Sequence, residues 1–307
     1  MEDKNSKKFI LKYIIDANKK KLPEAKKRKK NSANKTIDQH FIPQFYLNLF
    51  SNANRDIHVL NVKYGGITSK KSAQIMYEKI LYDIDFFDEC FDEFEEYFCK
   101  MEGLLSTMLE QLPKSIGDSK AFRLCKFHVM LLSAMQFCRN PYAELSNLIY
   151  ISTHLHLFYT NLVRFPYKEF LPPLKKKELK WISKKIAQSL KNEGMRNTFP
   201  LIWTVRIFIF PFLIFDYSNI DEVKILKIKN DDEFISSDNP VVIDSTEKFL
   251  NFKSFQFPLG KKLILYHSNN DANPTVNDLN MKTYNNAHLK VISSDPQVLD
   301  ELKLINF

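Results

Sequence analysis

A run of 17 nearly all apolar residues, FPLIWTVRIFIFPFLIF at positions 199–215, most constrains what this chain can fold into. So much apolar surface has to be removed from water. A membrane-spanning helix needs about 20 apolar residues and tolerates a central charge poorly. This run is shorter and carries Arg206 and Pro211 in its interior. We therefore expect a helix buried in a globular core and no membrane span.

Apolar residues recur every three or four positions through the middle of the chain, which is the spacing of one helix face. This spacing predicts helices over residues 88–112, 120–138, 143–163 and 174–190. We expect Pro141 to begin the third of these helices and Gly194 to end the fourth. The body of the protein is therefore expected to be largely helical.

Strand-like alternation of apolar and polar residues flanks the helical part on both sides. Residues 57–64 alternate and are followed by Gly65-Gly66, a hairpin turn signal. Further strands are expected at residues 223–228, 233–243, 262–267 and 291–293, with helices at 277–289 and 296–303. The predicted fold class is α+β: a large helical body with a small, mostly antiparallel sheet built from N-terminal and C-terminal strands.

The first 35 residues form a basic N-terminal arm with 13 basic and four acidic residues, whereas the remaining 272 carry 32 of each sign. We expect this arm, which could be flexible, to precede a single α+β domain over residues 36–307. Lysines near phosphates release counterions and so give salt-sensitive binding to nucleic acid. Three interpretations fit the arm: a nucleic-acid or ribosome contact, a leader that binds nothing specific, or a contact with a membrane surface or a partner protein. The candidate substrate-binding residues in it are Lys26, Lys27, Arg28, Lys29 and Lys30.

The four cysteines, Cys90, Cys99, Cys125 and Cys138, form no C-x-x-C pair and have no zinc-ligand spacing. Their pattern favours a reduced, cytoplasmic protein. Glycine is scarce, at 6 of 307 residues. Glycine-rich phosphate loops and the H-E-x-x-H and G-x-S-x-G motifs are absent from the sequence, so the enzyme classes built on them are not expected.

Three short polar motifs contain candidate catalytic residues. His40 precedes a helix expected to open at Pro43, where an imidazole can act as acid, base or phosphate contact, or can pack against the backbone. Arg139 ends a helix, where it can clamp a phosphate or complement the helix dipole. Asp238 lies in a polar break between two apolar runs, which is either a structural turn or a ligand-binding loop. The candidate substrate-binding residues beside them are Gln136, Ser237 and Asn239.

An acidic segment offers a candidate metal site. Residues 83–96 hold eight acidic residues and no basic one, and most of these must be solvated. Glu95 and Glu102 are seven residues apart and so share one helix face. Turned inward, they could bind Mg²⁺ or Mn²⁺ or pair with Arg139.

Four segments, in this order, resemble the domain of unknown function 4238 family: QHFIPQFYLNLF, QFCRNP, FISSDNPVV with FPLGKKLILY, and LNMKTYNNAHLKVISS. The family pattern is His-x-x-Pro-x-x-Tyr-Leu, Arg-x-Pro, Ser-Asp-Asn-Pro and an asparagine in a C-terminal helix. The resemblance spans about residues 38–295 and implies that His40, Arg139 and Asp238 belong to one site. It implies no reaction. The matching positions are His40, Pro43, Tyr46, Gln136, Arg139, Ser237, Asp238, Asn239, Pro258 and Asn280.

Three functions are compatible with these features. The first is a cytoplasmic nuclease of a defence or toxin system, with His40 as general acid/base, Arg139 stabilising phosphate charge and Asp238 orienting His40 or holding a metal. The second is a non-catalytic module that binds nucleic acid or a ribosome and whose motifs hold the fold together. The third is a membrane-acting effector that uses residues 199–215. An antitoxin-like partner protein fits the first function.

Overall fold

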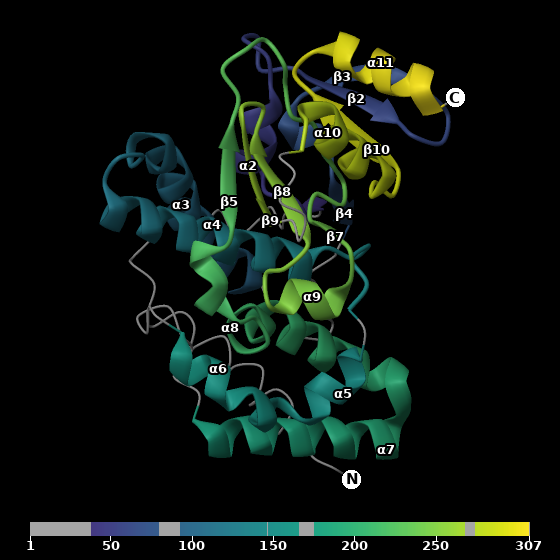
Figure 1. Ribbon diagram of the computed structural model, residues 1–307. Coiled ribbons are helices and arrows are strands. Elements are labelled where there is room, and N and C mark those ends of the chain that lie inside the picture. Colours follow the sequence, from purple (N-terminus) through teal and green to yellow (C-terminus); the bar gives the residue numbers. More distant parts are fainter. Residues whose placement is uncertain (1–37, 80–92, 146, 166–174, 268–273, 307) are drawn as a thin grey trace. The chain divides into compact units, whose positions relative to one another are not determined.

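The computed structural model describes residues 38–79, 93–145, 147–165, 175–267 and 274–306 (Figure 1). The described residues group into two compact units. A helical unit is built mainly from Leu145–Asp216, and a mixed unit from His40–Glu78, Leu105–Glu144 and Tyr217–Phe307. The α+β fold class is confirmed, with helices and small antiparallel sheets. The basic arm lies outside the described residues, and a single domain over residues 36–307 stays a prediction.

The helical unit contains one long helix and several short ones. The short elements are α5 (Leu148–Thr153), η4 (Leu155–Phe158), α6 (Tyr159–Arg164) and α8 (Phe210–Leu213). A single helix over residues 143–163 was the wrong prediction. Asn147 adopts a left-handed conformation with φ 58°, so helix α5 begins after Asn147 and not at Pro141. His154 then ends it with a non-helical backbone.

The long helix α7 (Lys176–Phe208) joins two of the predicted helices across a kink at Gly194. Before the kink, Leu179, Ile182 and Ile186 are buried, as their spacing predicts. After the kink, all residues from 201 to 208 are buried, and burial continues through α8 to Phe215. The predicted burial of this apolar run is confirmed for residues 201–215, whereas Phe199 at its start is exposed. Among the described residues, no helix is both long and apolar enough to span a membrane.

The mixed unit contains two four-stranded antiparallel sheets. The first has the order β3 (Ile67–Lys70), β2 (Ile57–Asn61), β10 (Lys290–Ser293) and β6 (Ser236–Ser237). The second has the order β5 (Lys224–Lys227), β9 (Leu263–His267), β8 (Phe255–Gly260) and β7 (Val242–Ile243). Strands β1 (Asp38–His40) and β4 (Tyr77–Lys79) form a two-stranded sheet.

Strand β2 pairs with β10, placing Val59 opposite Ile292. This confirms that N-terminal and C-terminal strands share a sheet. The hairpin at Gly65-Gly66 is also confirmed, because β2 pairs with β3 across it. Strand β8 was not predicted, since its sequence FQFPLG contains the strand-breaking residues Pro258 and Gly260. It is nevertheless buried along its whole length.

Helices complete the mixed unit. The longest is α4 (Ser119–Arg139), which Asp118 caps and which is buried at every position from Cys125 to its end. Helices α10 (Val276–Asn285) and α11 (Pro296–Asn306) are close to their predicted ranges. Helix α3 (Glu93–Gln111) also lies within its predicted range, and only its part from Leu105 onward belongs to the mixed unit. The remaining elements are α2 (Gln44–Leu47), η1 (Asn48–Phe50), η2 (Ser72–Gln74), η3 (Leu112–Lys114), η6 (Tyr217–Asp221) and α9 (Thr246–Leu250).

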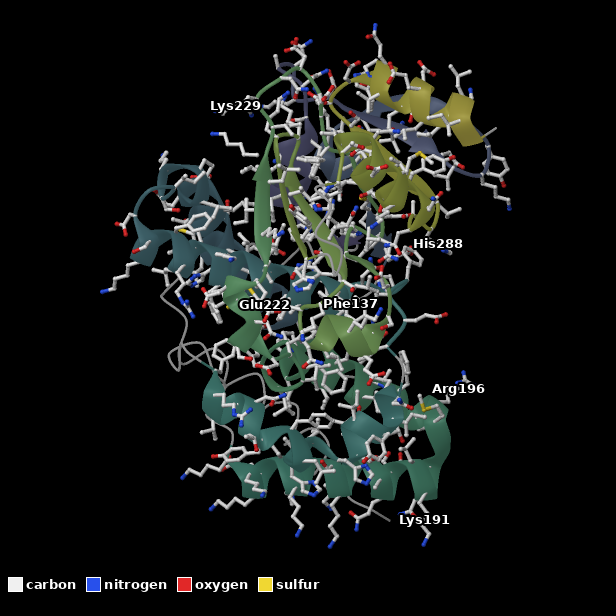
Figure 2. All side chains as sticks on the ribbon, viewed as in Figure 1. Phe137, Lys191, Arg196, Glu222, Lys229 and His288 are labelled. Atoms are coloured by element: carbon white, nitrogen blue, oxygen red, sulfur yellow. The ribbon has the colours of Figure 1, made fainter. Side chains whose placement is uncertain are left out.

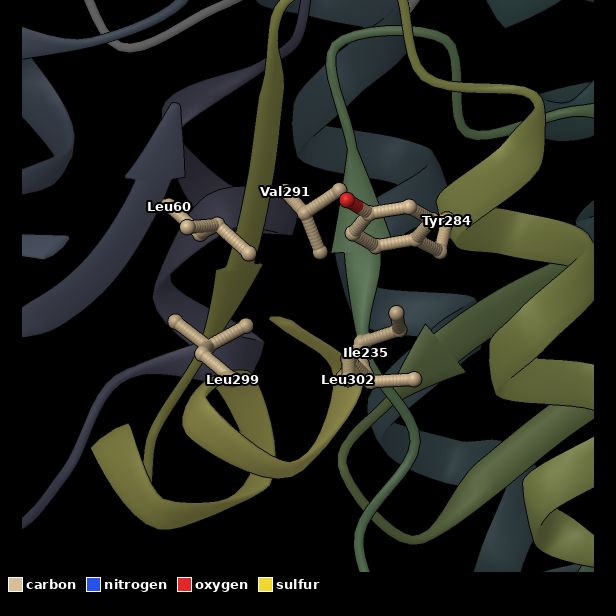
Figure 3. Close-up of a cluster of buried hydrophobic side chains, with 6 residues drawn as sticks. All are labelled: Leu60, Ile235, Tyr284, Val291, Leu299 and Leu302. Atoms are coloured by element: carbon tan, nitrogen blue, oxygen red, sulfur yellow. The ribbon is translucent and has the colours of Figure 1, made fainter. Parts of the chain in front are cut away.

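Helix α10 belongs to two hydrophobic clusters. Its Tyr284 packs in a cluster with Leu60 and Val291 of the first sheet, which helix α11 completes with Leu299 and Leu302 (Figure 3). One and a half turns earlier, Leu279 packs in a second cluster with residues of strand β9 and its surroundings. Helix α10 therefore packs against residues of both four-stranded sheets.

The kink in α7 gives a test of the fold. Gly194 has φ 78° and ψ 177°, a conformation that is essentially restricted to glycine, and a β-carbon there would meet no atom within 4 Å. Gly194→Ala should therefore lower the free energy of unfolding by about 1–3 kcal/mol through backbone strain alone. Urea unfolding followed by circular dichroism measures the change.

The matched control is Gly103→Ala in helix α3, where a β-carbon also has open space. Because alanine favours a helix interior, this variant should gain about 0.5–1 kcal/mol. Equal effects of the two substitutions would contradict the assignment of strain to Gly194.

Candidate functional site

The motif residues at the end of helix α4 bind the backbone that follows strand β1. The Nε2 of Gln136 donates a hydrogen bond to the carbonyl of Phe41 at 2.8 Å. One turn later, Nη2 of Arg139 donates to the carbonyl of His40. Both side chains are buried. The structure thus brings His40 and Arg139 together, and the contact uses the backbone of His40. The imidazole of His40 lies against the ring of Tyr77, with centroids 5.7 Å apart.

Asn140 connects the end of α4 to the Ser-Asp-Asn-Pro loop. Its Nδ2 donates to the carbonyl of Asp238 at 2.9 Å and to Oδ1 of Asn239 at 3.1 Å. Its own Oδ1 accepts from the backbone N–H of Tyr142. Helix α4 therefore ends with Asn140 as its C-cap, and the Asn140 side chain binds the Ser-Asp-Asn-Pro loop, which lies about 100 residues later in the sequence.

The carboxylate of Asp238 lies at the centre of the loop. Its Oδ1 accepts a hydrogen bond from the N–H of His288 at 2.8 Å, and its Oδ2 accepts from the N–H groups of Leu289 and Lys290 at 2.8 and 3.0 Å. The residue is only 2% exposed. Burial raises the pKa of Asp238, and the three N–H groups oppose that rise because they hold the ionised form. Both oxygens are therefore engaged by the segment that leads from α10 into β10.

The neighbouring side chains of the loop also bind backbone atoms. Ser237 Oγ accepts from the N–H of Asn239, and Asn239 Nδ2 donates to the carbonyl of Asn286 at 3.2 Å. Asn286 returns the contact, with Nδ2 donating to the carbonyls of Asn239 and Val241 at 2.7 and 3.3 Å. Asn286, just after α10, was not singled out in the sequence. Its contacts are to carbonyl groups, which every residue type offers.

Two further residues that the resemblance singled out have similar roles deeper in the unit. The hydroxyl of Tyr46 donates to the carbonyl of Pro258 at 2.8 Å and lies 2.9 Å from Ser236 Oγ, and burial raises its pKa. Asn280 on α10 accepts from the N–H of Ile235 and donates to the carbonyl of Glu233. These bonds fix the chain just before strand β6 and at its first residue.

One solvent-facing group beside the loop was not predicted. The hydroxyl of Tyr142 donates to Oε1 of Glu78 at 2.8 Å, and the ring of His288 stacks on the Tyr142 ring at 4.1 Å and 13°. His288 is exposed and lies at the edge of the unit (Figure 2). Burial, followed by the bond to Glu78, raises the pKa of Tyr142, so its phenol stays protonated. The adjacency of Tyr142 to the Arg-Asn-Pro motif was the only sequence signal for this group.

The remaining predicted site residues lie on helix α3 or in segments outside the described residues. Glu102 is half-buried on α3, and the Glu95 side chain lies outside the described residues. Also outside the described residues are the five basic residues of the arm, Lys26, Lys27, Arg28, Lys29 and Lys30. Within the ranges that the structure describes, no three His, Cys, Asp or Glu side chains are grouped so that they could hold a metal ion.

Comparison with known proteins identifies a family. The model of the family described as "Protein of unknown function (DUF4238)" matches residues 38–199, which is more than half of the chain. This range includes the motifs around His40 and Arg139 and ends before the Ser-Asp-Asn-Pro loop. No significant match was found among curated proteins or among solved structures.

The contacts of Asp238 predict a structural role for this residue. Asp238→Ala leaves three backbone N–H groups without the buried carboxylate that accepts from them, so the free energy of unfolding should fall by about 3 kcal/mol or more. Thermal and urea unfolding measure the loss. Asp300→Ala, which removes an exposed carboxylate from helix α11, is the control and should change stability by less than about 0.5 kcal/mol. A stable, well-folded Asp238→Ala protein would contradict the structural role.

Proposed function

Since the chain belongs to the DUF4238 family, whose description names no activity, we propose from its own contacts and charges that it binds nucleic acid without cleaving it. In this proposal the motif residues are a framework that holds the mixed unit together. Binding is a property of basic segments outside that framework. The observation that carries the choice of a binding module over a nuclease is the engagement of the Asp238 carboxylate by three backbone N–H groups.

A carboxylate that orients a catalytic histidine or holds a metal needs a lone pair directed at that partner. Asp238 is buried, and its described hydrogen bonds all run to backbone N–H groups. Arg139 is likewise buried, and it donates to the carbonyl of His40. These contacts support a framework role for both residues. They are the interactions expected where polar side chains replace missing secondary-structure bonds.

The charge distribution supports nucleic acid as the partner. The arm carries a net charge of +9 within 35 residues, while the rest of the chain is neutral overall. Such clustering favours salt-sensitive contact with phosphates over a general affinity of the whole surface. The buried free thiols of Cys125 and Cys138 suit a reducing compartment, so we place this function in the cytoplasm.

A nuclease of a defence or toxin system is the second candidate. The observation in its favour is the group of Glu78, Tyr142 and His288, because it offers a carboxylate and an exposed imidazole joined through a protonated phenol. General acid–base chemistry uses such side chains. In that case His288 joins His40 as a candidate acid or base, and dependence on Mg²⁺ or Mn²⁺ has to be tested.

The test combines binding and cleavage on the full chain. Wild-type protein should bind a labelled 20-nucleotide RNA and a 20-base-pair DNA duplex, with binding that weakens steeply as salt increases. Replacing Lys26, Lys27, Arg28, Lys29 and Lys30 by glutamine should weaken binding by tenfold or more. Neither substrate should be cut, with or without Mg²⁺ or Mn²⁺. Fluorescence anisotropy and gel analysis of the same samples measure both properties.

Two variants decide between the candidates. His40→Ala and His288→Ala should bind as the wild type does if the protein only binds. Cleavage by the wild type that is lost in either variant, while that variant remains folded, would replace the binding module with the nuclease.

A further inference from the structure

We infer that the exposed face of helix α7 before its kink is a second nucleic-acid contact surface, which binds the phosphodiester backbone. The inference rests on the proposed function and extends it from the arm to a described element. We name this surface the α7 basic face and define it by Lys177, Lys180, Lys184 and Lys191.

The spacing of these lysines places them on one side of the helix. At about 100° per residue, the four positions fall within an arc of about 60°. The buried residues Leu179, Ile182 and Ile186 lie on the opposite side. The α7 basic face is therefore the solvent side of an amphipathic helix whose apolar side is already used in the core.

The charge of this face is not compensated along the helix. Only two acidic residues, Glu178 and Glu193, occur between residues 176 and 193, and both fall outside the arc of the lysines. Glu178 is engaged at the start of the helix, where it accepts a hydrogen bond from the N–H of Lys175. The α7 basic face is thus a row of positive charges without an acidic residue among them.

The lysines are available to a partner. All four are exposed, and within the part of the chain that the structure describes they form no ion pair or side-chain hydrogen bond. Figure 2 shows Lys191 extending from α7 into solvent, with Arg196 beyond the kink also exposed. Flexible ammonium groups of this kind suit phosphates, which need charge rather than a fixed geometry.

The length of the face fits a nucleic-acid backbone. From Lys177 to Lys191 the helix rises by about 21 Å, at about 1.5 Å per residue. One strand of a duplex rises about 3.4 Å per phosphate, so the row spans about six steps. A row of positive charges of this length can therefore reach several phosphates of a nucleic-acid backbone.

A membrane surface is the other polyanion that a basic helix can meet. Amphipathic helices that bind membranes insert an apolar face into the lipid boundary. In α7 that face is not available, because Leu179, Ile182 and Ile186 are fully buried in the protein. Before the kink the exposed side of α7 carries the lysine row, whereas the exposed apolar residues Met195 and Phe199 lie beyond Gly194. We therefore commit to nucleic acid.

The test replaces all four lysines of the α7 basic face by glutamine in the full chain. Affinity for the 20-base-pair duplex should fall by tenfold or more, and the slope of log affinity against log salt should become shallower by about 3 to 4. Replacement of the same four residues by arginine keeps the charge and should restore both. Circular dichroism and thermal unfolding check that each variant folds as the wild type does.

The control variant removes the same charge elsewhere. Glutamine at the exposed residues Lys227, Lys248, Lys253 and Lys282 of the mixed unit should change affinity by less than about threefold. Equal weakening by the control and the α7 variant would overturn the inference, since only net charge would then matter. So would a protein that loses binding when Lys26–Lys30 are replaced but keeps it when the α7 basic face is replaced.

Two other outcomes bear on this inference and on the proposed function, and the second distinguishes between them. Wild-type protein that binds neither RNA nor DNA at low salt would overturn both. Wild-type protein that binds vesicles containing phosphatidylserine, with loss of vesicle binding but unchanged nucleic-acid binding in the α7 variant, would assign the face to a membrane and leave the function of the arm intact.

Discussion

The mixed unit depends on the hydrogen bonds that stabilise one buried carboxylate, that of Asp238. Asp238 is almost fully removed from water, and an ionised group in that position requires donors. Three successive N–H groups, those of residues 288–290, supply them just where the chain leaves α10 and enters β10. Because these groups point at one carboxylate, the path of that segment is fixed, and with it the strand that joins N-terminal and C-terminal parts of the sheet.

The fold was largely predictable because periodicity reports burial directly. The helix at residues 174–190, the apolar run after Gly194 and the strand at 57–61 all follow from side-chain spacing. The broken helix after Pro141 was not predictable in this way. Its apolar spacing is helical, but the left-handed backbone at Asn147 and the end at His154 interrupt it. Strand β8 was not predicted because Pro258 and Gly260 usually interrupt a strand. Here the buried strand contains both residues, at a position where its pairing register with β9 shifts.

The candidate site was predictable as a group of residues and not as a set of contacts. The sequence indicated that His40, Arg139 and Asp238 belong together, and the structure connects them through Asn140 and backbone groups. A side chain that binds a backbone carbonyl or N–H does not require a particular residue type as its partner, so the sequence does not reveal the contact. A different limit explains why the total charge of the chain did not indicate the α7 basic face. Outside the arm the basic and acidic residues balance, and only their placement separates them.

The loop around Asp238 also joins two sheets through a very short stretch of chain. Strand β6 belongs to one sheet and strand β7 to the other, and only residues 238–241 lie between them. Neither sheet can open at this end without pulling on the other, so the two should unfold as one cooperative block. Amide hydrogen exchange at residues 288–290 should then proceed only through global unfolding, at rates far below those of the exposed hairpin between β2 and β3.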